Sequence, residues 1–70
     1  MGEFDYINRY YQLSLRKGTR CTFDDSGVLR PGRVVSADGA HINIRFDHAP
    51  RKTVGPFHPT WNMTYPEAAA

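Results

Sequence analysis

The clearest pattern in the chain is a strict alternation of apolar and polar positions over residues 40–46, typical of a strand with one buried and one wet face. A shorter alternating segment lies at 20–23, and a segment with the β-branched pair Val34 and Val35 lies at 33–37. Turn sequences separate the three segments, at 24–27 and at 38–39. The second is Asp-Gly, which favours a tight hairpin and requires a positive φ at Gly39. The pattern therefore predicts an antiparallel β-meander.

The flanking segments carry weaker patterns. Apolar side chains at helical spacing over 4–13 predict one amphipathic helix that docks on the sheet. A polar loop is expected at 47–53, a fourth strand at 54–57, a single 3₁₀ turn at 58–61 and a short closing strand near Met63 and Tyr65. The expected core consists of Phe4, Ile7, Tyr11, Leu15, Cys21, Phe23, Val34, Ile42, Ile44, Phe46, Trp61 and Met63.

Composition limits the chain to one small domain with a small core, because it has 70 residues. Cys21 is the single cysteine, so neither a disulfide within the chain nor a cysteine-metal cluster is possible. The lone thiol, the absence of a long apolar run and an N-terminus unlike a signal peptide predict a cytoplasmic protein that does not enter a membrane. The net charge of +2 is mildly basic.

The order of the predicted elements resembles the SH3-like barrel, and two segments look like its KOW and Tudor-type members. Those segments are 32–35, Gly-Arg-Val-Val, and 42–44, Ile-Asn-Ile. The resemblance implies a five-stranded barrel over about 17–65. The helix predicted from the apolar spacing, over about 4–13, precedes it, and a disordered tail is expected at 66–70. RNA binding is not carried over, because the basic loop residues of KOW proteins have no sharp counterparts here.

The whole chain also resembles short uncharacterised proteins of bacteriophages and prophages. The shared motifs are Tyr-Ile-Asn-Arg at 6–9, Lys-Gly at 17–18, Gly-Ala at 39–40 and His-Pro-Thr-Trp at 58–61. This resemblance implies a phage origin and a bacterial host cytoplasm, and it brings no known activity.

Basic residues concentrate on the meander: residues 16–52 contain eight Lys or Arg against four Asp. Guanidinium groups on a rigid sheet can contact phosphates, and Asn or His can reach bases and sugars. The other interpretation is an ordinary solvated sheet face, on which the four aspartates lower the positive electrostatic potential. The candidate nucleic-acid-binding residues are Arg20, Arg33, His41, Asn43, Arg45, Arg51 and Lys52.

Aromatic residues form the second candidate site. Most of the nine are expected in the core, yet the polar atoms of several Tyr and Trp side chains require partial exposure. A shallow groove for a proline-rich or methylated peptide is one interpretation, and the seat of the N-terminal helix is the other. The candidate groove residues are Tyr10, Phe57, Trp61 and Tyr65.

No arrangement for nucleophilic, acid–base or metal chemistry is recognisable in the sequence. His41, His48 and His58 match no compact ligand spacing, and Asp24 and Asp25 belong to a turn. We therefore expect no metal, no cofactor and no catalytic residue. The predicted function is a small non-enzymatic binding or adaptor module that acts through a protein partner or self-association. The alternative is a nucleic-acid-binding module that uses the basic face of the meander.

Overall fold

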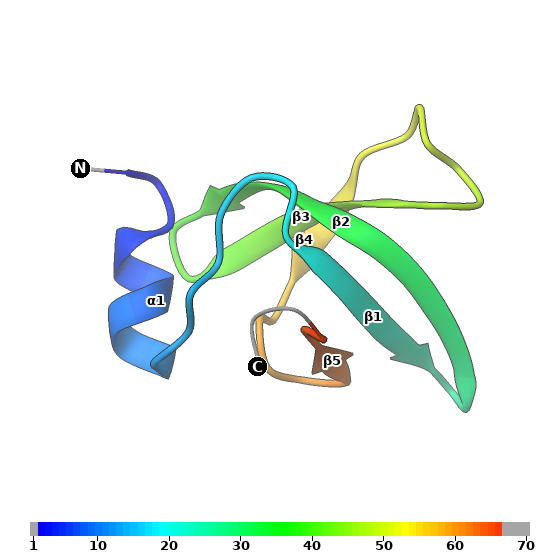
Figure 1. Cartoon of the computed structure of the whole chain (residues 1–70), viewed down its shortest axis with the longest axis horizontal. Coiled ribbons are helices and arrows are strands. Elements are labelled where there is room, and N and C mark those ends of the chain that lie inside the picture. The colour runs from blue at the N-terminus through cyan, green and yellow to red at the C-terminus, as the bar shows by residue number, and fades with distance from the viewer. Residues whose placement is uncertain (1, 67–70) are drawn as a thin grey trace.

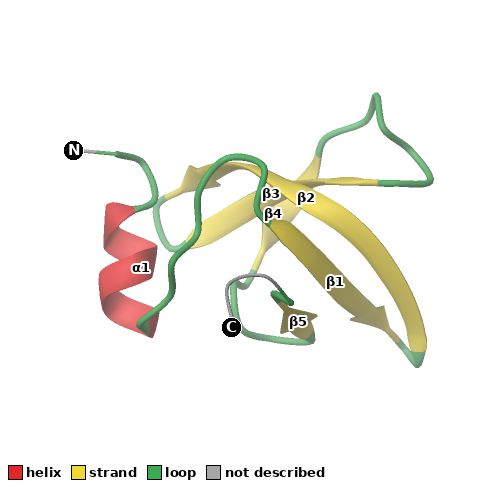
Figure 2. Cartoon of the chain, viewed as in Figure 1, coloured by secondary structure: helices red, strands yellow, loops and turns green. Residues whose placement is uncertain are grey.

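The structure is a computed structural model that describes residues 2–66, so residues 67–70 of the predicted disordered tail lie outside the described residues. One helix, α1 (Asp5–Tyr11), precedes five strands: β1 (Arg20–Asp25), β2 (Val28–Asp38), β3 (His41–Phe46), β4 (Val54–Phe57) and β5 (Met63–Thr64). The strands form a single antiparallel sheet in the order β4-β3-β2-β1-β5 (Figures 1 and 2). The prediction of a mainly β fold with one short helix is confirmed.

Two tight turns connect the meander where the sequence predicts them. In the first, the Asp24 carboxylate accepts a hydrogen bond of 2.7 Å from the backbone N–H of Gly27, which has φ +93°. In the second, Gly39 has φ +63°, as the Asp-Gly pair requires. Gly27 and Gly39 have no Cβ and take their positive φ without strain, whereas Ser26 of the first turn is a non-glycine residue at φ +51°. The two reversals place β1, β2 and β3 side by side.

The sheet is strongly curled. A bulge at Val35 interrupts the pairing of β2 with β3, and a second irregularity lies between β3 and β4. Because of the curl, Phe23 of β1 meets Phe57 of β4, with 5.0 Å between ring centroids, although two strands separate them in the sheet. Within residues 2–66 the hydrogen-bonded sheet remains open, with β4 and β5 at its edges.

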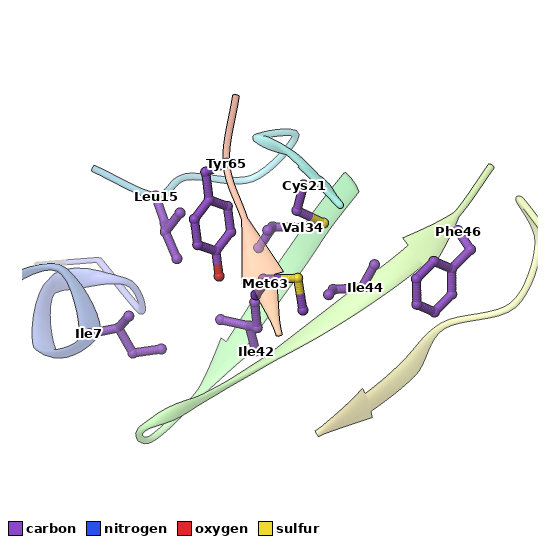
Figure 3. Packing of buried hydrophobic residues seen from close by; sticks show 9 residues of the cluster. All are labelled: Ile7, Leu15, Cys21, Val34, Ile42, Ile44, Phe46, Met63 and Tyr65. Carbon is purple, nitrogen blue, oxygen red and sulfur yellow. The ribbon is translucent and has the colours of Figure 1, made fainter. Parts of the chain in front are cut away.

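The concave side of the sheet holds a core of nine buried side chains (Figure 3). Eight of these were expected there, and three others (Phe4, Tyr11 and Phe23) pack against the core half-buried. The prediction for Trp61 is wrong, because 70% of that side chain is exposed. Tyr65 occupies the core instead, and its hydroxyl donates a hydrogen bond to the carbonyl of Pro59. This partner makes burial of the phenol tolerable.

Helix α1 is shorter than predicted and lies at one end of the sheet, beside the β2–β3 turn (Figure 1). It ends because Gln12 takes a left-handed conformation with φ +57°. Asn8 then holds the following segment, since its amide accepts from the N–H of Leu15 (2.7 Å) and donates to the carbonyl of Leu15 (2.9 Å). These bonds keep Ile7 and Leu15 together in the core.

The segment before the last strand also differs from its prediction. Residues 58–62 form bends and a turn, with Asn62 at φ +58°, so the single 3₁₀ turn is not formed. Pro59 is buried there while Trp61 points outward, 70% exposed. The local chain thus presents an indole ring at the surface rather than inserting it into the core.

Candidate functional site

Three arginines lie directly opposite one another across the central strands of the sheet. Arg20 of β1 pairs with Arg33 of β2, and Arg33 pairs with Arg45 of β3. Residues paired in this way project from the same face, with Cβ atoms about 4.5–5.5 Å apart. Their chain neighbours Cys21 and Val34 are buried, so this set, the arginine row, lies on the outer face of the sheet.

Asp47 balances one of the three charges in the row. Arg20 donates two hydrogen bonds to its carboxylate, at 2.8 and 3.1 Å. These bonds hold the pKa of Asp47 below its ordinary value, and the positive charges of Arg20 and Arg33 contribute in the same direction. Arg45 donates to the hydroxyl of Thr53 at 3.0 Å. Among residues 2–66 no carboxylate forms an ion pair with Arg33 or Arg45, so two positive charges of the row are not neutralised by direct contact.

A shallow hollow of about 410 Å³ lies against the arginine row. The loop at 47–53 forms one wall of it, and two arginines form the other. The lining residues are Arg33, Val35, Arg45, Phe46, Asp47 and Pro50. Arg51 and Lys52 are exposed in the same loop, so this part of the predicted basic site is brought to one end of the sheet.

The other two predicted nucleic-acid-binding residues do not join the row. Asn43 donates a hydrogen bond of 2.9 Å to the hydroxyl of Ser36, and a Cβ on Gly55 would overlap its amide. Asn43 is therefore engaged within the sheet. His41 lies at the far end of β3, where its ring centroid is 6.4 Å from that of His58.

Aromatic rings form a continuous surface beside this end of the sheet. Tyr6 stacks on Tyr10 along α1, with centroids 5.8 Å apart, and Tyr10 meets Tyr11 edge-on at 4.8 Å. Tyr11 contacts His58 at 5.3 Å, and His58 stacks on Trp61 at 4.2 Å with an interplanar angle of 9°. These five residues are called the ring surface. Tyr6, Tyr10 and Trp61 are each more than half exposed.

The predicted peptide groove is not assembled as one site. Tyr10 and Trp61 belong to the ring surface, whereas Tyr65 is buried and Phe57 faces Phe23 and Phe46. The sequence reasoning missed His58, which links the helix to Trp61. The one available signal was its spacing of three residues from Trp61 inside a proline-bounded turn.

A second hollow, of about 320 Å³, has the rings of Phe23, Phe46 and Phe57 as its floor. Its rim carries the ion pair of Asp25 with Arg30, at 2.9 Å. Among the described residues, no buried side-chain polar atom lacks a hydrogen-bond partner. The hollow therefore contains no unsatisfied group that points to a particular ligand.

Two buried side chains in the described part of the chain have raised pKa values. Burial raises the pKa of the Cys21 thiol to about 11, so the thiol is almost entirely protonated at neutral pH. Burial also raises the pKa of Tyr65. No three His, Cys, Asp or Glu side chains of residues 2–66 lie close enough together to hold a metal ion.

Comparison of the chain with protein-family models, curated proteins and solved structures found no significant match. No helix among the described residues has the length and apolar character needed to cross a membrane. The arginine row and the ring surface are the candidate binding surfaces of the described residues.

Proposed function

We propose that this chain is a small non-enzymatic binding module that contacts the phosphates of a nucleic acid through the arginine row. We also propose that its curled sheet is an SH3-like barrel; the strand order supports this. Origin in a bacteriophage remains a prediction from the sequence.

The register of Arg20, Arg33 and Arg45 is the observation that carries the proposal. Like charges directly opposite one another destabilise a sheet, so the row costs stability in the free protein. A polyanion removes this cost, because each phosphate places negative charge between the guanidinium groups. Arginine suits this role, since its planar donors match phosphate oxygens in pairs. The hollow beside Arg33 and Arg45 gives a phosphate access to both.

Docking of a protein partner, or self-association, is the second candidate function. The exposed rings of Tyr6, Tyr10 and Trp61 favour it, because large aromatic side chains are enriched at protein interfaces. This candidate predicts a solution mass above the 8.0 kDa of one chain, or capture of a partner, that persists at high salt. It also predicts that Tyr10→Ser reduces the association while substitutions in the arginine row do not.

Fluorescence anisotropy with a labelled oligonucleotide of about 12 nucleotides tests the first proposal. The test variant is Arg33→Ala with Arg45→Ala. The control is Arg9→Ala with Arg30→Ala, which removes the same charge from the helix and from the rim of the phenylalanine hollow. We expect wild type and control to bind at about 50 mM salt and the test variant to bind at least about 10-fold more weakly. Equal affinity of test and control variants would contradict the proposal.

A further inference from the structure

We infer that the nucleic acid held at the arginine row is single-stranded, and that one of its bases stacks on Trp61 above His58. The inference rests on the proposed function. It adds a ligand class and a second contact point, which the charges alone do not provide.

The arginine row and the ring surface are connected along one strand. The outer positions of β3 are Arg45, Asn43 and His41, and the first and last are four residue steps apart. At about 3.3 Å per residue, Arg45 and His41 are about 13 Å apart. Phe57 of β4 pairs with Ile42, so the next residue, His58, comes beside His41. A ligand that follows the outer face of β3 therefore runs from the arginines to the histidines and Trp61.

His58 is fixed in place before any ligand arrives. Its Nδ1 accepts a hydrogen bond from the backbone N–H of Thr60 at 3.1 Å, and its Nε2 lies 3.2 Å from the hydroxyl of Tyr11. Trp61 lies flat on this ring, and 70% of its side chain is exposed. One face of the indole is therefore covered by His58, and its other face is available to solvent. A rigid exposed ring of this kind can stack a base with little loss of side-chain entropy.

Charge sets the direction of the ligand on this path. Asp38 pairs directly with His41 at the ring end of β3, so that end repels phosphates. The arginine row attracts them at the other end. We therefore place phosphates over Arg33 and Arg45 and a base on Trp61.

Only a single strand can place phosphates over the arginine row and also stack a base on Trp61. Bases in a duplex are stacked on their neighbours and offer no free face, whereas an unpaired base can stack on an aromatic ring. Stacked nucleotides advance about 3.4 Å along the strand. The path of about 13 Å along β3 therefore corresponds to about four stacked nucleotides, and Trp61 lies beyond its histidine end.

The fluorescence of Trp61 tests the inference directly, because it is the sole tryptophan of the chain. Labelled oligo(dT) of about 12 nucleotides and a duplex of equal length are titrated at about 50 mM salt, with anisotropy and tryptophan emission recorded together. We expect both ligands to bind and only the single strand to quench the emission. Oligo(dT) of two nucleotides should neither quench nor bind measurably.

Trp61→Ala is the test variant, and Leu29→Ala is the matched control, since Leu29 of β2 is 68% exposed but belongs to neither the arginine row nor the ring surface. Trp61→Ala should weaken single-strand binding at least about 5-fold and leave duplex binding unchanged. Trp61→Phe should retain most of the affinity, and Leu29→Ala all of it. Melting curves verify that each variant is folded.

Failure of the stacking inference can be distinguished from failure of the proposed function. If the arginine variants lose binding but Trp61→Ala does not, or if duplex and single strand behave alike, the stacking inference is overturned and the proposed function stands. If neither ligand binds wild type, both are overturned, and protein docking on the ring surface becomes the leading function.

Discussion

We expect the charge at residue 33 to affect the stability of the free protein and the proposed affinity for phosphate in opposite directions. Arg33 lies between Arg20 and Arg45 and near Asp47. Replacing it with Lys, Gln and Glu changes its charge from +1 to 0 to −1 at similar side-chain length. We expect the free energy of unfolding to increase in that order.

The size of the effect follows from the charges around residue 33. Two arginines and one aspartate leave a net neighbouring charge of +1, at about 5 Å for side chains directly across the sheet. In a solvent-exposed setting, each unit change of charge is then worth about 0.8 kcal/mol. The Lys and Glu variants should differ by about 1.6 kcal/mol, which is about 6–13 °C in Tm for a domain of this size.

Urea unfolding at about 10 mM and about 1 M salt measures this series. At low salt Arg33→Lys should be the least stable of the three variants, Arg33→Gln intermediate and Arg33→Glu the most stable. At high salt the differences should nearly disappear, because the charges are screened. Stabilities that are equal at low salt, or that differ equally at both salt concentrations, would show that Arg33 does not experience a net positive field. Oligonucleotide affinity should decrease along the same series.

Further predictions concern packing and protonation. Gly32→Ala should lower the free energy of unfolding by about 1–3 kcal/mol in urea titrations, because its Cβ would lie 2.7 Å from the carbonyl oxygen of Arg45. Cys21 should react with a thiol reagent at pH 8 far more slowly in the folded chain than in denaturant, since its pKa is about 11. Because the pKa of Asp47 is lower in the folded protein than in the unfolded chain, its ionised carboxylate stabilises the fold at pH values above the unfolded pKa. This stabilisation is lost as the pH falls below about 4. Acid titration of Asp47→Asn should therefore show a smaller loss of stability than wild type.

The meander was predictable because its signals are local. Strict alternation over 40–46 and the Asp-Gly turn define the strand faces and one hairpin without any long-range contact. The position of Trp61 was not predictable in this way. Its burial depends on whether Tyr65 or Trp61 enters the core, and the buried carbonyl of Pro59 gives the Tyr65 hydroxyl a partner there.

The candidate site was predictable in residue type but not in arrangement. The sequence identified the basic residues of the outer face, whereas the row depends on the pairing register of three strands and on the bulge at Val35. A register shift of one residue at the first turn would separate Arg33 from Arg20, and one at the second turn would separate Arg33 from Arg45. The ring surface likewise depends on the contact of Tyr11 with His58, which are 47 residues apart in sequence.

The salt dependence of single-strand binding tests the central claim most directly, because it counts phosphate contacts. The association constant is measured at several salt concentrations for wild type and for the variant with Arg33→Ala and Arg45→Ala. Its logarithm is then plotted against the logarithm of the salt concentration. On a single strand, each phosphate contact contributes about 0.7 to the magnitude of the slope. The loss of two contacts should therefore reduce that magnitude by about 1.4. Identical slopes would contradict the assignment of the arginine row as the phosphate-binding site.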